Sequence, residues 1–156
     1  MPMIVRIVSA LIMAVALVPP VAAQDLKTAT KKGNFDDVKF ELSNAIIERG
    51  LKVDFSGSIS QMLERTGADI GSTKPIYKHA EFMSFCSSKL SRQMMEADAA
   101  NVAFCPYTVF IYETAAAPGE IVVGYRPFPQ PPNETSRAAL GEIDKLLSGI
   151  IKAAVQ

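Results

Sequence analysis

Hydrophobic and polar positions follow two different periods along the chain. Apolar residues recur at spacings of three and four in residues 35–49, 90–97 and 140–154, which predicts three amphipathic helices. Apolar and polar residues alternate over residues 51–59, which predicts a strand with one buried face. Further strands are predicted at residues 28–32 (as an edge strand), 76–86, 108–113 and 121–125.

Residues that cap or end helices stand at the boundaries of these segments. They are Asn34, Ser60 and either Ser87 or Ser88 at helix starts, and Gly50 and Gly67 at helix ends. Ser60 therefore predicts a further short helix that ends at Gly67. The segment 115–119, Ala-Ala-Ala-Pro-Gly, predicts the turn of a hairpin between the last two strands.

The order of elements predicts the fold class. It reads strand, helix, strand, short helix, strand, helix, hairpin, helix, which fits an antiparallel-rich sheet with helices packed on one face. We therefore expect a single α+β domain with its core in residues 24–132, and a C-terminal amphipathic helix within residues 133–156 packed on it. A chain of 156 residues with 49% hydrophobic positions is suited to one packed domain and not to a disordered chain.

The first 23 residues have the pattern of a signal peptide. Arg6 is the only charged residue, and an apolar run over residues 7–18 follows it. Pro19 and Pro20 then interrupt any helix, and small residues lead to a predicted cleavage site after Ala23. The apolar run is shorter than the roughly 20 residues that a membrane span needs. We expect a periplasmic or secreted protein with no membrane attachment after cleavage.

The net charge of the chain and the absence of several known sequence motifs exclude some classes of function. The 16 basic residues balance the 16 acidic ones, so the chain lacks the positive charge that non-specific nucleic-acid binding uses. No Gly-x-Ser-x-Gly elbow, glycine-rich phosphate loop or Cys-x-x-Cys motif occurs. We expect no nucleic-acid partner and assign no catalytic residue.

Three segments in the second half of the chain resemble a known bacterial family. They are residues 76–86 (IYKHAEFMSFC), 90–98 (LSRQMMEAD) and 104–107 (FCPY), followed by the predicted hairpin. Together with the helix and strand before them, they resemble the family called Domain of Unknown Function 302, over about residues 28–128. The resemblance implies a small TBP-like α+β domain able to form a homodimer. It implies no reaction and no active site, and this chain has Cys86-Ser87-Ser88 where many members have Asn-Pro.

Cys86 and Cys105 are the most informative pair of residues. They lie 105 − 86 = 19 positions apart with one predicted helix between them. An even number of cysteines in an exported protein indicates a disulfide. Two buried, reduced thiols are the first alternative, and a reactive or metal-binding pair is the second.

His79 and Glu81 are the polar candidates for a site. Both fall on one face of the predicted strand 76–86, where they could act as a general acid–base pair. We favour the interpretation that they lie on the solvated or interfacial face of a half-buried strand. A copper(I) site using soft ligands such as Met83 and Met94 is disfavoured, because Cys86 falls on the opposite face from His79 and Met83. No metal or cofactor is assigned.

These observations favour an exported, non-enzymatic module that binds a small ligand or a periplasmic protein partner. The alternative is a thiol- or metal-based function, with copper or redox chemistry, centred on Cys86 and Cys105. An enzyme that uses His79 and Glu81 is a third hypothesis.

Overall fold

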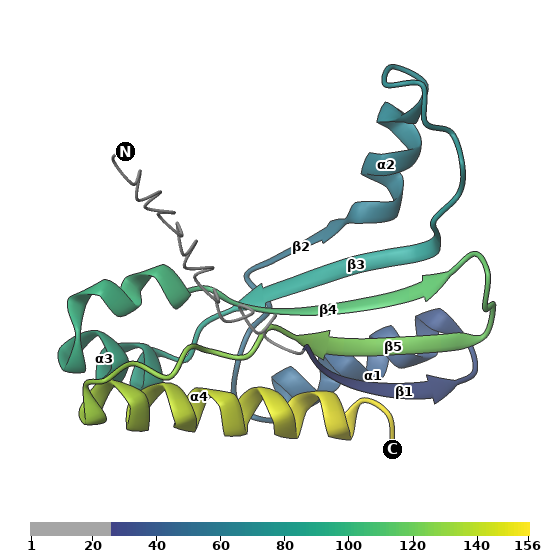
Figure 1. Cartoon of the computed structure of the whole chain (residues 1–156). Helices are drawn as coiled ribbons and strands as arrows, with labels where there is room; N and C mark the ends of the chain where they lie inside the picture. Colours follow the sequence, from purple (N-terminus) through teal and green to yellow (C-terminus); the bar gives the residue numbers. More distant parts are fainter. Residues whose placement is uncertain (1–25) are drawn as a thin grey trace, which may run out of the picture.

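Five antiparallel strands form one sheet in the order β1-β5-β4-β3-β2 (Figure 1). The computed structural model describes residues 26–156, so the predicted signal peptide lies outside the described residues. The strands are β1 (Lys27–Lys32), β2 (Phe55–Ser58), β3 (Tyr77–Phe85), β4 (Tyr107–Thr114) and β5 (Glu120–Tyr125). The helices are α1 (Phe35–Ile47), α2 (Ile59–Gly67), α3 (Ser88–Ala97), the 3-10 helix η1 (Ala99–Phe104) and α4 (Glu134–Ala153). This arrangement confirms the predicted α+β class and single domain.

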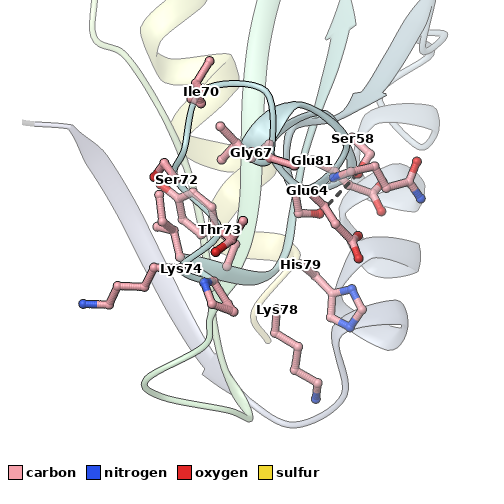
Figure 2. Close-up of a pocket in the computed structure, with 17 residues that line it drawn as sticks. Ser58, Glu64, Gly67, Ile70, Ser72, Thr73, Lys74, Lys78, His79 and Glu81 are labelled. Carbon is pink, nitrogen blue, oxygen red and sulfur yellow. Dashed lines mark hydrogen bonds between the residues drawn. The ribbon is translucent and has the colours of Figure 1, made fainter.

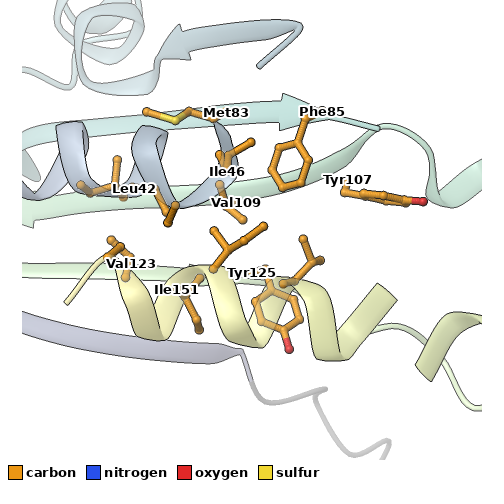
Figure 3. Close-up of a cluster of buried hydrophobic side chains, with 14 of the residues drawn as sticks. Leu42, Ile46, Met83, Phe85, Tyr107, Val109, Val123, Tyr125 and Ile151 are labelled. Carbon is orange, nitrogen blue, oxygen red and sulfur yellow. The ribbon is translucent and has the colours of Figure 1, made fainter. Parts of the chain in front are cut away.

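The hydrophobic core lies between one face of the sheet and helices α1 and α4 (Figure 3). From the sheet, Ile111, Ile121 and Val123 are fully buried, because successive side chains of a strand point to opposite faces. From the helices, Leu42 of α1 and Leu147 of α4 pack into the same cluster. The predicted apolar stripes of both helices therefore face the sheet. Helix α3 packs on α4 at one end of the domain, while α2 stands at the β2–β3 edge (Figure 1).

Side-chain caps position the helices that flank the sheet. The Asn34 side chain accepts hydrogen bonds from the backbone N–H groups of Asp36 and Asp37 at the start of α1, as predicted. Ser87 caps α3 by accepting from the N–H of Leu90. The 3-10 helix η1 that follows α3 was not predicted.

The segment from Leu51 to Gly67 differs from the prediction. The strand was predicted over residues 51–59, but β2 comprises only Phe55–Ser58. Leu51 and Val53 lie before this strand, where they pack against the hydrophobic core. Phe55 was predicted to share their buried face, but its register opposite Ser84 places it on the other face, 62% exposed. Helix α2 begins two residues earlier than predicted, because Ser58 caps it and the Ser60 hydroxyl instead accepts a hydrogen bond from the N–H of Ala80.

The sheet has a second face that α1 and α4 do not cover, which we call the open face. Strand register places these residues on it: Thr28, Thr30, Phe55, Gly57, Ala80, Phe82, Ser84, Thr108, Phe110, Tyr112, Val122 and Gly124. The odd-numbered residues of β3, from His79 to Phe85, point to the helix-covered face, as their predicted alternation requires.

The first described strand is held against the last helix. β1 pairs with β5 along its whole length, and Lys27 Nζ lies 2.6 Å from a carboxylate oxygen of Asp144 in α4. The buried Tyr125 hydroxyl donates to the other Asp144 oxygen at 3.0 Å, and burial together with this contact raises the pKa of Tyr125.

Within residues 26–156, no helix has the length and apolar character needed to span a membrane.

Candidate functional site

A pocket of about 610 Å³ lies between α2, the loop that follows it and the first half of β3 (Figure 2). It exists because β2 is short. Ser58, the last residue of β2, pairs with Glu81, so the part of β3 before Glu81 has no strand on this side. The chain instead turns into α2, and the loop from Ala68 to Ile76 returns over this edge of the sheet.

The pocket lining combines charged, hydroxyl and apolar side chains. Its charged and titratable members are Glu64, Lys74, Lys78, His79 and Glu81. Its apolar members include Leu63, Ile70, Pro75, Ile76 and Tyr77. Ligand sites commonly have this composition, in which apolar surface supplies contact area and a few polar groups fix orientation.

His79 and Glu81 both line this pocket, and each is also bound to α1. The His79 ring stacks on Phe35 with 4.7 Å between ring centroids. Glu81 pairs with Lys39, with 2.6 Å between Oε2 and Nζ. Their side chains are 45% and 20% exposed, so they sit at the rim of the helix-covered face. Strand β3 places them on one face, as predicted, but a separate α1 residue binds each.

Glu113 is a buried carboxylate behind the pocket wall, and sequence reasoning did not single it out. It lies opposite His79 in the β3–β4 register, and its side chain is 3% exposed. Its Oε1 accepts hydrogen bonds from the Gly119 N–H at 2.7 Å and from Lys78 Nζ at 3.2 Å. His79 Nε2 lies 3.9 Å from Oε2. Its position in the sequence could have indicated that it is buried. Glu113 continues the alternate, inward-facing positions of β4 that Tyr107, Val109 and Ile111 occupy.

The surroundings of Glu113 favour its ionised form. The Gly119 N–H is the main cause, and it holds the pKa of Glu113 below its ordinary value of 4.5. Burial opposes this shift, while Lys78 and His79 reinforce it. Glu113 therefore acts as a fixed negative charge that positions Lys78 and His79, two residues of the pocket wall. The arrangement can orient a polar ligand at this wall of the pocket.

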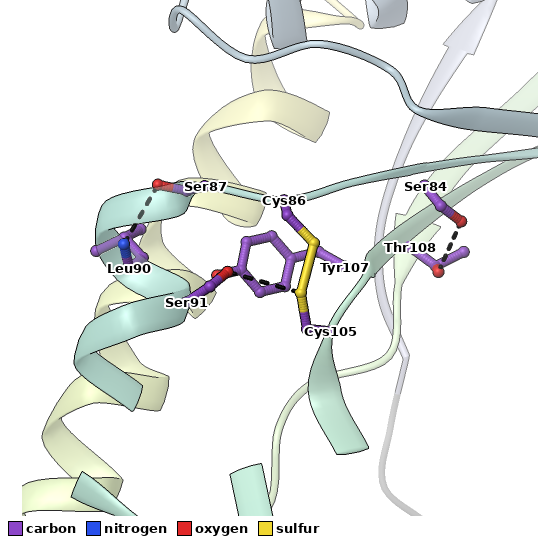
Figure 4. The surroundings of a disulfide bond; sticks show 8 residues. All are labelled: Ser84, Cys86, Ser87, Leu90, Ser91, Cys105, Tyr107 and Thr108. Atoms are coloured by element: carbon purple, nitrogen blue, oxygen red, sulfur yellow. Dashed lines mark hydrogen bonds between the residues drawn. A yellow bond between two sulfur atoms is a disulfide. The ribbon is translucent and has the colours of Figure 1, made fainter. Parts of the chain in front are cut away.

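The cysteine pair lies at the other end of β3. The structure joins Cys86 and Cys105 as a disulfide, with their Cα atoms 6.5 Å apart (Figure 4). The Ser91 hydroxyl lies 3.6 Å from Cys105 Sγ and 2.8 Å from the Tyr107 hydroxyl. Burial raises the pKa of Tyr107, so this hydroxyl is neutral. Cys86 follows the end of β3 and lies seven positions after His79, or about 23 Å along an extended chain, so the two candidate regions are distinct.

The methionines weighed for copper belong to the hydrophobic core. Met83 and Met94 are both buried in the hydrophobic core, where they pack against apolar neighbours. In the part of the chain that the structure describes, no three His, Cys, Asp or Glu side chains are grouped as metal ligands would be.

Comparison with known proteins identifies the family. The family described as "Domain of unknown function DUF302" matches residues 26–153, and the chain belongs to it. The fold is similar to the crystal structure of an uncharacterized conserved DUF302 protein from Bacillus stearothermophilus, with a TM-score of 0.67 and 14% identity. That match covers 85% of this chain and 99% of the other, and at this identity it shows the shared fold. A search of curated proteins finds no match.

Proposed function

We propose that this protein is an exported, non-enzymatic binding module that holds a small molecule in the pocket at the β3 edge. The pocket itself is the observation that carries the proposal. Its volume of about 610 Å³ falls in the range of roughly 300–1,000 Å³ that is typical of small-molecule sites.

The charges of the lining indicate the class of ligand. Lys78 and Glu81 bring opposite charges to the lining, and each already has an ion-pair partner, Glu113 and Lys39 respectively. Lys74 and Glu64 add one further charge of each sign, so the lining is balanced. A strongly charged ligand would have to compete with these pairs. A neutral or zwitterionic molecule can instead hydrogen-bond to both groups while its apolar part contacts Ile70 and Ile76.

Thermal unfolding with defined probes tests this proposal. Free amino acids, dipeptides and neutral sugars serve as the zwitterionic and neutral probes. A binding probe at 100 times its Kd stabilises the protein by about 2.7 kcal/mol, which raises Tm by several degrees. Thr73→Trp, in the exposed loop that lines the pocket, should abolish the rise, and Ser88→Trp, exposed on α3, should retain it. No rise with any probe, or equal rises in both variants, would contradict the assignment.

Export is part of the proposal and has its own test. The apolar segment before Pro19 and the pairing of Cys86 with Cys105 both support an oxidising compartment. The intact mass of the protein isolated from the periplasm of an expressing Gram-negative host should correspond to a chain that begins at Gln24. A full-length chain that remains in the cytoplasm would contradict export.

A thiol-based function is the second candidate, and the contact between Ser91 and Cys105 favours it. The Ser91 hydroxyl and the N-terminus of α3, which follows Cys86, could stabilise a thiolate if the bond were reduced. Alkylation of the exported protein before denaturation separates the two candidates. An unalkylated mass about 2 Da below the reduced value supports a structural bond. Rapid alkylation of a partly reduced pair supports the thiol function.

A further inference from the structure

The residues that define the open face carry aromatic rings and hydroxyl groups and no charge. One row in register crosses all five strands: Thr28, Gly124, Phe110, Phe82 and Gly57. The rows on either side add two further rings and three aliphatic hydroxyl groups, from Phe55, Tyr112, Thr30, Ser84 and Thr108. A solvent-facing sheet surface normally includes charged residues, so this composition indicates a binding surface.

Two glycines allow rings of this face to lie across neighbouring strands. A Cβ at Gly57 would be 2.7 Å from Phe82 Cε1, and a Cβ at Gly124 would be 2.6 Å from Phe110 Cζ. Each ring therefore occupies the space that a side chain on the adjacent strand would take. The rings lie low over the sheet as a result, and they form a platform rather than a set of projecting side chains.

Four rings from three adjacent strands make up this platform, which we call the aromatic band: Phe55, Phe82, Phe110 and Tyr112. The ring centroids of Phe55 and Phe82 are 5.7 Å apart. Those of Phe110 and Tyr112 are 6.1 Å apart, with 24° between the ring planes. Phe82 lies opposite Phe110 in the β3–β4 register, which places the two pairs side by side. Phe55 is 62% exposed, so one end of the band is open to a partner.

Hydroxyl groups lie on two sides of the aromatic band. Thr28 and Thr30 are exposed on the edge strand β1. Ser84 and Thr108 are opposite each other, with 3.2 Å between their hydroxyl oxygens, and Thr108 is exposed (Figure 4). A hydroxyl group both donates and accepts hydrogen bonds. The open face therefore combines aromatic surface with hydrogen-bonding groups that carry no charge.

We propose that the open face binds an uncharged glycan chain of β-1,4-linked N-acetylhexosamines. The pyranose rings of such a chain have C–H groups on their flat sides and polar groups around their edges. The face of an aromatic ring carries partial negative charge, so it attracts C–H groups that the sugar oxygens polarise. The threonine hydroxyls can hydrogen-bond to the polar groups at the sugar edges. The choice of N-acetylhexosamine rests on the proposed export, because the glycan strands of the bacterial cell wall contain this sugar.

Other classes of partner fit the open face less well. A nucleic acid or an anionic lipid surface would require cations at the aromatic band. Five strands about 4.8 Å apart and about six residues long give a footprint of about 19 by 20 Å, or roughly 400 Å². A standard protein interface needs roughly 800 Å² per partner. An acyl chain requires a site that encloses it, whereas a glycan chain can lie along a flat face.

Two phenylalanines of nearly equal exposure provide a matched test. Phe55 in the aromatic band is 62% exposed, and Phe40 on α1 is 64% exposed. An open face covers one side of its ligand, so chitohexaose should bind the mature protein with a Kd of about 0.1–1 mM in isothermal titration calorimetry. Phe55→Leu keeps an apolar side chain but removes the ring, and it should weaken binding at least fivefold. Phe40→Leu should bind as the wild type does.

Two further measurements distinguish this site from the pocket and from general sugar binding. Thr73→Trp, which blocks the pocket, should retain the affinity for chitohexaose, because the open-face residues are separate from the pocket lining. Maltohexaose, whose α-1,4 linkages curve the chain away from a flat surface, should bind at least tenfold more weakly than chitohexaose. The circular dichroism of each variant should match that of the wild type.

Four results would overturn the inference. One is the absence of measurable heat with chitohexaose. Another is unchanged binding in Phe55→Leu, which would show that the ring is not required. A loss in Thr73→Trp with retention in Phe55→Leu would place the sugar in the pocket and leave the proposed function intact. Equal affinity for maltohexaose and chitohexaose would contradict recognition of a flat, β-linked chain.

Discussion

Glu113 accepts a 2.7 Å hydrogen bond from the backbone N–H of Gly119, so a buried carboxylate closes the turn between β4 and β5. The same oxygen contacts Lys78, which lines the pocket on β3. One carboxylate therefore connects the hairpin turn with the wall of the candidate site. Its protonation bears on both the stability of the fold and the position of Lys78.

Acid should destabilise the protein partly through Glu113. The folded state lowers the pKa of this group, so its contribution is complete above the ordinary value of 4.5 and is lost as pH falls through the lower folded pKa. Urea unfolding between pH 7 and pH 3 measures this loss. Glu113→Gln should be less stable at pH 7 by about 1–3 kcal/mol and should lose less on acidification. Glu120→Gln, on an exposed residue, should behave as the wild type, and identical pH profiles for all three proteins would contradict this role.

Two glycine substitutions should have effects of opposite sign. Gly124→Ala places a Cβ 2.6 Å from both Phe110 Cζ and the Lys27 carbonyl oxygen. The ring and strand β1 must shift, at a cost of about 1–3 kcal/mol. Gly141→Ala meets no atom within 4 Å and lies inside α4, so it should stabilise by about 0.5–1 kcal/mol. Denaturant midpoints measure both, and a neutral Gly124→Ala would argue against the close approach of Phe110.

Asn101 should be important for the junction between α3, η1 and α4. Its buried Nδ2 donates to the Met94 carbonyl and to the Ser136 hydroxyl, both at 2.7 Å. Asn101→Ala leaves the fully buried Ser136 hydroxyl without this donor, so the free energy of unfolding should fall by about 1–3 kcal/mol. The adjacent Val102→Ala, at an exposed position, should change it by less than about 0.5 kcal/mol. Equal effects in urea unfolding would rule out a specific role for the Asn101 amide.

The disulfide should stabilise the protein through the loop that it closes. A separation of 19 residues between Cys86 and Cys105 corresponds to about 3 kcal/mol in the chain-entropy treatment. The double variant Cys86→Ser/Cys105→Ser should lose about that amount relative to the oxidised wild type. Addition of dithiothreitol should destabilise the wild type and leave the double variant unchanged. A wild type that is insensitive to reductant under unfolding conditions would contradict a stabilising bond.

Much of the fold follows from the local pattern of apolar and polar residues. The predictions that failed concern segments whose structure depends on contacts between residues distant in the sequence. The cap at Asn34 and the stripe of α4 depend on residues close in sequence, so periodicity predicts them. Ser58 and Ser60 are both competent to cap α2. Ser58 caps the helix because the Ser60 hydroxyl is already engaged: it accepts a hydrogen bond from the backbone N–H of Ala80, twenty positions later in the chain. No local rule contains that contact.

The candidate site was predictable only in part. Period-two alternation placed His79 and Glu81 on one strand face, and both line the pocket. Their partners Phe35 and Lys39 come from α1, so the sequence pattern could not show that these side chains are engaged. The sequence shows that Glu113 is a charged residue in a series of inward-facing positions of one strand. Its contact with Lys78 depends on the pairing of β3 with β4, which brings together two residues 35 positions apart.

The contact between Lys27 and Asp144 joins positions 117 residues apart, and β1 depends on β5 for all of its strand pairing. The edge of the sheet can therefore form only after almost the whole chain is available. A chain that emerges from a ribosome in the N-to-C direction cannot complete this structure during its synthesis, because β5 and α4 come last. The topology therefore delays completion of the fold until β5 and α4 are available to β1.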